Sequence, residues 1–337
     1  MRYLWVFCFS LLFFSPSSIA FGQTGLDTLG LTGTIADTAI AKRLFVEMGG
    51  YVKSRKLKEA DELGKVILSI YTQTLGADCK EVANTWHQIG IIQFFQTNYN
   101  EAIDIWETTL RIRLKVFGNE HPDVAWSYNN LGAAYNKKGD FEKSIAFHQK
   151  ALEMRIKLLG GDHLDIAASY NNLGINYKDM GKFDQAIVYY EQSLAIRTKV
   201  LGPTHLDVAD SYNNLGTSYF NKGEYDKCGA YHLKALEIRM ARLGATHPSV
   251  ADSYNNLAIN YSIKGANDQA LACFQNSLNI RLKYWKPDHP ELADSYNNIG
   301  TIYFYKGDFE KALRFQQKSL DIRINVLGGC SSHLMYN

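Results

Sequence analysis

The residues best suited to chemistry in this sequence are pairs of adjacent asparagines that recur every 42 residues. The pairs are Asn129/Asn130, Asn171/Asn172, Asn213/Asn214, Asn255/Asn256 and Asn297/Asn298. A carboxamide both donates and accepts hydrogen bonds, so a row of carboxamides can bind the backbone of an extended peptide whatever its side chains. The same groups can instead bond to one another and fix how neighbouring repeats stack. The sequence predicts a peptide-binding row and leaves this structural alternative open.

Other residues on the same helix face differ between repeats and could select the side chains of a ligand. Three consecutive repeats carry an aspartate three positions before the asparagine pair, and aromatic residues follow the pair in two of them. These residues are Asp210, Asp252 and Asp294, and Phe220, Phe304 and Tyr305. An acidic line with aromatic pockets predicts a basic or mixed peptide with apolar anchors. Alternatively, the aspartates favour the positive end of the helix dipole and face only water.

A histidine opens each of these repeats, at His121, His163, His205, His247 and His289. One histidine per repeat places successive imidazoles on the order of 10 Å apart, the spacing of packed helices. That spacing is too large for them to share a metal ion. We therefore expect the histidines to shape the turn into the following helix.

Arginines recur late in each repeat, at Arg113, Arg155, Arg197, Arg239, Arg281 and Arg323. A cation suits the negative end of a helix, but an ion pair to a neighbouring repeat is equally consistent with the spacing. The sequence contains no nucleophile elbow, Walker loop, HExxH or glycine-rich dinucleotide fingerprint. We therefore expect no catalytic residues, no metal, no cofactor and no enzymatic activity.

Helices must position these side chains, because the apolar residues around them have helical spacing. The hexapeptide that begins at Ser127 returns at residues 169, 211, 253 and 295, and a fixed period of this kind is typical of stacked repeats. In the repeat 121–162, Pro122 is expected to open a first helix and Gly139 to end it with a left-handed cap. A second helix is predicted from Phe141 to Leu159. Its buried side is expected to consist of Ile145, Ala151, Leu152, Ile156 and Leu159.

The order Tyr128, Leu131, Gly132, Tyr135, Gly139-Asp140-Phe141 and Ala151-Leu152 resembles the tetratricopeptide repeat. The 42-residue period and the opening His121 to Ala125 are similar to the longer version found in kinesin light chains and kinesin-light-chain-like bacterial proteins. The resemblance implies an all-α fold, an α-solenoid that forms a right-handed superhelix of about seven helical hairpins whose concave face binds peptides. The expected hairpins are 37–78, which is degenerate, and 79–120, 121–162, 163–204, 205–246, 247–288 and 289–330.

The two ends of the sequence do not follow the repeat. Residues 1–22 have a basic start at Arg2, an apolar run from Tyr3 to Phe14 and small residues before Gln23, the layout of a secretory signal peptide. The apolar run is shorter than the ~20 residues that a membrane-spanning helix needs. We therefore expect an exported protein with no membrane span in its mature form, periplasmic or secreted if bacterial. Residues 23–36 are predicted to be a flexible lead-in and residues 331–337 an irregular tail.

The function expected from these features is that of a non-catalytic scaffold that binds a peptide or protein partner in the concave groove. The net charge of +2, from 36 basic and 34 acidic residues, gives no sign of a nucleic-acid surface. The alternative is the sensor or regulatory part of a bacterial signalling or caspase-like peptidase system, with its effector supplied in trans or lost by truncation. Self-association through the uncapped C-terminal end is a further expectation, because terminal repeats normally carry a polar cap.

Overall fold

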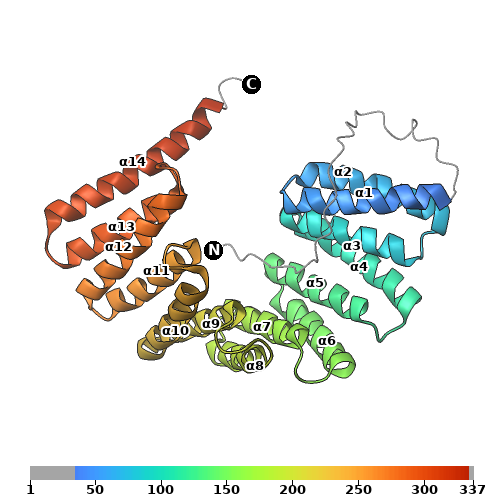
Figure 1. Cartoon of the computed structure of the whole chain (residues 1–337), viewed down its shortest axis with the longest axis horizontal. Helices are drawn as coiled ribbons and strands as arrows, with labels where there is room; N and C mark the ends of the chain where they lie inside the picture. Colours follow the sequence, from blue (N-terminus) through green and yellow to red (C-terminus); the bar gives the residue numbers. More distant parts are fainter. Residues whose placement is uncertain (1–34, 334–337) are drawn as a thin grey trace. The chain divides into compact units, whose positions relative to one another are not determined.

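The computed structural model describes residues 35–333, with side chains for residues 37–326. The predicted signal peptide, 1–22, lies outside the described residues. All regular structure in the described range is helical, in agreement with the predicted fold class, and consists of 14 helices (Figure 1). They are α1 (Ile35–Lys53), α2 (Leu57–Leu75), α3 (Lys80–Phe95), α4 (Tyr99–Phe117), α5 (Pro122–Lys138), α6 (Phe141–Leu159), α7 (Leu164–Asp179), α8 (Phe183–Leu201), α9 (Leu206–Lys222), α10 (Tyr225–Leu243), α11 (Pro248–Ile263), α12 (Asn267–Tyr284), α13 (Pro290–Tyr305) and α14 (Phe309–His333).

The chain divides into two compact parts, one up to Thr85 and one from Trp86 onward. In the first part, α1 and α2 pack against each other as a hairpin. In the second part, each odd-numbered helix from α5 to α13 pairs with the even-numbered helix that follows it. Each even-numbered helix from α4 to α12 also packs against the next odd-numbered helix. The second part is therefore a row of stacked hairpins, and no helix among residues 35–333 combines the length and apolar character needed to cross a membrane.

The predicted helices of the repeat 121–162 are confirmed at both ends. Helix α5 begins at Pro122 and ends before Gly139, whose φ of 85° and ψ of 4° are left-handed. Helix α6 spans Phe141–Leu159. The prediction of its buried side is partly wrong, because Ile156 and Leu159 are 42% and 37% exposed. Polar residues take the inner positions beside Ala151 and Leu152, namely Ser144, His148 and Arg155, since α6 packs against both α5 and α7 and bonds to each of them.

The recurrent histidines cap the first helices, as predicted. The Nδ1 atom of His121 accepts a hydrogen bond from the backbone N–H of Asp123 at 3.1 Å, and the other four histidines make the same bond. This bond satisfies one of the backbone donors that every helix start leaves unpaired. The His121 ring also stacks on Phe117 of the preceding helix at 4.1 Å.

A recurrent arginine, here called the junction arginine, joins each second helix from α4 to α12 to the next first helix. The Nη1 atom of Arg155 donates to the Ser169 hydroxyl at 2.7 Å and to the backbone carbonyl of Asp165 at 3.0 Å. The hydroxyl in turn donates to that same carbonyl. The other arginine–serine bonds are Arg113–Ser127, Arg197–Ser211, Arg239–Ser253 and Arg281–Ser295, at 2.8 to 3.0 Å. The arginines thus bond to the neighbouring hairpin mainly through neutral oxygens, and Arg281 also forms an ion pair with Glu291 of that hairpin at 3.6 Å.

The glycine that ends four of the five hexapeptides allows a close approach within the hairpin. A Cβ atom on Gly132 would lie 2.8 Å from the ring of His148 on α6, a distance that real Cβ contacts do not reach. The residue 16 positions after the glycine fills this place in the other hairpins. It is Trp106, Tyr190, His232 and Gln316 opposite Gly90, Gly174, Gly216 and Gly300, and Phe274 is the equivalent residue after Ala258.

The last helix is longer than the repeat predicts. Helix α14 continues through Gly328 and Gly329 to His333, three residues into the segment 331–337 for which the sequence predicts irregular structure. Each glycine costs a helix only about 1 kcal/mol relative to alanine. Gly160 ends α6 at the place of Gly328, but α14 continues past that glycine, and no histidine stands at residue 331 to cap a further first helix.

Removing a junction arginine should destabilise the stack. Arg155 is 3% exposed, so Arg155→Ala leaves a cavity and removes the donor to the Ser169 hydroxyl and the Asp165 carbonyl, and we expect a loss of about 2–3 kcal/mol. Arg323→Ala is the matched control, because Arg323 makes one exposed ion pair and should cost below about 1 kcal/mol. Urea unfolding followed by circular dichroism measures both. Equal urea midpoints for the two variants would contradict the assigned role.

Candidate peptide-binding face of the first helices

The predicted asparagine row is a hydrogen-bonded ladder. The second asparagine of a pair donates its Nδ2 to the Oδ1 of the first asparagine in the preceding repeat. The four bonds are Asn172–Asn129 at 2.8 Å, Asn214–Asn171 at 2.9 Å, Asn256–Asn213 at 3.0 Å and Asn298–Asn255 at 3.3 Å. The ladder connects α5, α7, α9, α11 and α13 in turn, so half of each of the eight bonded carboxamides holds neighbouring repeats together.

Where both members of a linked pair are partly exposed, the other half of each carboxamide is available to a ligand. In the linked pair Asn213–Asn256, the Nδ2 of Asn213 and the Oδ1 of Asn256 bond to no other described residue. One donor and one acceptor side by side match the N–H and C=O groups of a peptide backbone. Access differs along the row. Asn129, Asn172 and Asn214 are buried, whereas Asn130, Asn171, Asn213, Asn255, Asn256, Asn297 and Asn298 are partly exposed. Linked pairs with both members partly exposed therefore lie on α9, α11 and α13.

A small cavity adjoins the C-terminal end of this row. It encloses about 120 Å³ between α11 and α13, beside Asn298 and Thr301. Its other lining residues are Ile259, Ser262, Ile263, Phe274 and Ile302. The cavity is mostly apolar, so it suits a small apolar side chain of a peptide whose backbone bonds to the asparagines.

The three aspartates of the predicted acidic line are each paired within their own hairpin. Asp210 and Asp252 accept from Arg239 and Arg281 at 2.6 and 2.9 Å. Asp294 accepts from Arg323 at 3.0 Å. An arginine balances each carboxylate, so the line carries little net charge for a ligand to meet. In the repeat 121–162 the same position holds Trp126, whose ring lies 4.8 Å from the Arg155 guanidinium.

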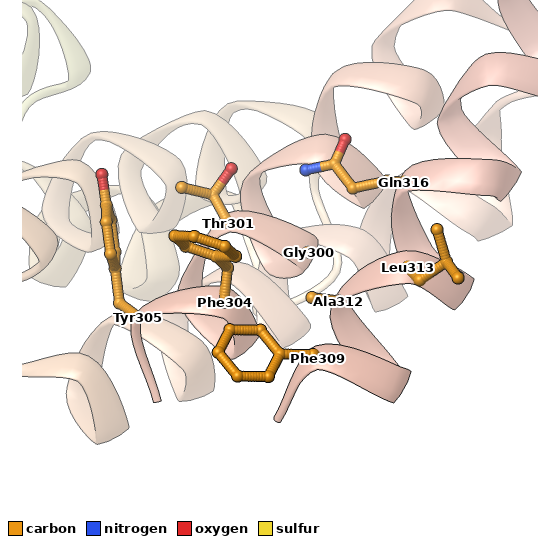
Figure 2. A pocket seen from close by; sticks show the side chains of 8 residues that line it. All are labelled: Gly300, Thr301, Phe304, Tyr305, Phe309, Ala312, Leu313 and Gln316. Atoms are coloured by element: carbon orange, nitrogen blue, oxygen red, sulfur yellow. The ribbon is translucent and has the colours of Figure 1, made fainter. Parts of the chain in front are cut away.

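The three predicted aromatic residues do not form one pocket. Phe220 is partly buried and contacts Tyr225 edge to face at 5.7 Å. Phe304 and Tyr305 lie near the end of α13 and line a larger open groove with Phe309 of α14 (Figure 2). Thr301 lines both the groove and the small cavity, so the two are adjacent.

Two buried histidines lie behind this face. The sequence does not indicate them, because their position is histidine only in alternate repeats. Burial, with the nearby Arg155, lowers the pKa of His148 to about 3. Burial and Arg239 lower the pKa of His232 to about 4. The Nδ1 atom of each has no hydrogen-bond partner in the described structure. Both rings are therefore neutral near pH 7. Among residues 37–326, no group of three histidine, cysteine or acidic side chains could hold a metal ion.

Comparison with known proteins gives a consistent family and fold. The tetratricopeptide repeat profile matches residues 81–157, 128–199, 165–226, 207–283 and 263–325. No curated protein sequence matches. Similar solved structures include the following three.

The first is BtubC (BKLC) from P. vanneervenii, at 24% identity and a TM-score of 0.59, over 69% of this chain and 91% of that one. A putative kinesin light chain with nearly identical repeats, from Podosopora anserina, is 23% identical with a TM-score of 0.55, over 61% and 98%. Aspartyl phosphate phosphatase F from Bacillus subtilis is 14% identical with a TM-score of 0.62, over 86% and 71%. At these identities the likenesses show the fold.

The buried histidines predict a loss of stability in mild acid. Their folded pKa values lie below the unfolded value of about 6.5, so the stability is fully present above pH 6.5 and declines as the pH falls toward 4. Between pH 7 and 5 we expect a loss of about 2 kcal/mol per histidine.

The double variant His148→Tyr/His232→Tyr should flatten this dependence, because Tyr190 already fills the equivalent place opposite Gly174. Urea unfolding at several pH values measures the slope. A slope unchanged in the variant would show that other groups cause the acid sensitivity.

Proposed function

Because the chain belongs to the tetratricopeptide repeat family, we propose that it is a non-catalytic scaffold that binds an extended segment of a protein partner. The proposed site is the exposed face of α9, α11 and α13. Arrays of this kind present extended surfaces to partners.

The observation that carries the proposal is the unpaired half of the asparagine ladder. The pairs Asn213–Asn256 and Asn255–Asn298 each offer one donor and one acceptor on a partly exposed surface. Adjacent first helices of a stack lie roughly 10 Å apart, which is the rise of about three residues of extended chain. A peptide running across the helices thus meets one asparagine pair about every third residue.

The neighbouring side chains indicate which peptide fits. The cavity beside Asn298 takes a small apolar side chain. Asp210, Asp252 and Asp294 already have arginine partners, so they give little preference for a basic ligand. The site thus favours a segment with small apolar residues and mixed polarity. A regulatory role in a signalling or peptidase system would use the same face, with the bound segment belonging to an effector.

The site can be tested with the variant Asn213→Ala/Asn255→Ala/Asn297→Ala in affinity capture from an extract of the source organism. Each lost hydrogen bond is worth about 1 kcal/mol, so three should weaken capture of a partner by about a hundredfold. Asn130→Ala is the matched control, since Asn130 is equally part-exposed but lies on α5. Circular dichroism checks folding. Equal capture of the same proteins by wild type and the triple variant would show that the ladder is purely structural.

We also propose that residues 1–22 direct export and are removed. Expression in a bacterial host, followed by fractionation and N-terminal sequencing, is expected to yield a periplasmic or secreted protein that begins at Gln23. Deletion of residues 1–22 should leave the protein in the cytoplasm. A cytoplasmic product that retains Met1 would contradict export.

A further inference from the structure

The last hairpin exposes an apolar groove. In earlier hairpins of the second part, the helix that follows covers the equivalent groove. Phe304, Phe309 and Leu313 are 57%, 63% and 70% exposed along the groove between α13 and α14. Gln316 and Thr301 flank them (Figure 2). The groove encloses about 590 Å³. Large exposed apolar side chains grouped in this way mark an interaction surface.

The hairpin α3–α4 shows what such a groove accepts. Its Phe94, Tyr99, Ile103 and Trp106 occupy the positions of Phe304, Phe309, Leu313 and Gln316, 210 residues earlier. There the groove is filled by α5, whose Leu131, Ala134 and Tyr135 pack into one cluster with Ile103 and Trp106. Ile103 is 5% exposed, against 70% for Leu313. The groove of α3–α4 contains α5, whereas among residues 35–333 no helix lies in the groove of α13–α14.

A second filled groove repeats the arrangement. On α8, Ile187 and Tyr190 lie under Leu215 and Tyr219 of α9. Each odd-numbered helix from α5 to α13 carries leucine or isoleucine, with tyrosine four residues later. These pairs are Leu131/Tyr135, Leu173/Tyr177, Leu215/Tyr219, Leu257/Tyr261 and Ile299/Tyr303. Residues four apart share one helix face, so the pair forms a two-point anchor.

We propose that the groove between α13 and α14 binds an amphipathic helix of a partner protein that presents leucine or isoleucine and, four residues later, tyrosine. Binding of an apolar helix face in a groove is an established mode of recognition. A second copy of the chain fits poorly, because the helices with this pair are buried in their own stack. Helix α1 carries an exposed Glu47 at the leucine position before Tyr51, and an apolar groove disfavours a carboxylate.

The test titrates the full chain into a fluorescein-labelled, end-blocked peptide of residues 122–138, the α5 helix, and follows anisotropy. We expect saturable binding. Leu131→Ser/Tyr135→Ser in the peptide should weaken it by about tenfold or more, because both anchors are lost. Leu313→Glu in the chain should have the same effect without unfolding, since that side chain is already exposed. Val188→Glu is the matched control, because Val188 is an exposed apolar residue, at 53%, on another hairpin.

Absence of binding up to about 1 mM of the full chain would overturn the proposal, and so would binding that Leu313→Glu leaves unchanged. Light scattering on the same samples checks for a dimer. A dimer that Leu313→Glu converts to a monomer would place a second copy in the groove and also overturn the proposal. The triple asparagine variant should bind the α5 peptide normally, so failure here is distinguishable from failure of the peptide face.

Discussion

The stack of hairpins depends on one repeated interaction, the bond from a junction arginine to the serine that opens the next hexapeptide. In the first three junctions the guanidinium is mostly buried, and burial lowers the pKa of Arg113, Arg155 and Arg197. A buried cation is costly unless its donors are satisfied. The serine hydroxyl and a backbone carbonyl accept from the Nη1 atom of Arg113 and of Arg155, and both acceptors are in place only when the following helix is docked. The burial of the arginine in one hairpin thus depends on the docking of the next hairpin. The bond also fixes the position of the next first helix relative to the arginine.

The asparagine ladder can combine structure and recognition because a carboxamide has two chemically distinct ends. One end is used in the bond between repeats, and the bond holds the other end in a defined orientation. Binding then costs little ordering of these side chains, which is an advantage for a partner segment that must itself be ordered. The aspartates differ from the asparagines, because the carboxylates of Asp210 and Asp252 already form ion pairs with Arg239 and Arg281. Exposure alone therefore does not identify the groups that are free to bind.

Local signals made most of the fold predictable. The period, the helix that starts at Pro122 and the cap at Gly139 follow from residues close in sequence, and the structure bears them out. The failures concern contacts between distant residues. The exposure of Ile156, the burial of His148 and the pairing of Asp210 with Arg239 depend on which helices pack together. A periodic pattern cannot distinguish a central position from one at the rim of such a contact. The sequence predicts an uncapped C-terminal end but does not identify Leu313 as the centre of its groove, because apolar residues at the same positions elsewhere are covered.

The central claim is that a partner segment bonds to the first helices of the last three hairpins. Hydrogen–deuterium exchange of the chain, alone and with a captured partner, tests it most directly. The account predicts slower exchange in residues 211–217, 253–259 and 295–301, around the hexapeptides of α9, α11 and α13, and unchanged exchange in α10 and α12. Protection confined to α10 and α12, with the hexapeptide segments unaffected, would place the partner on the opposite helices and contradict the account.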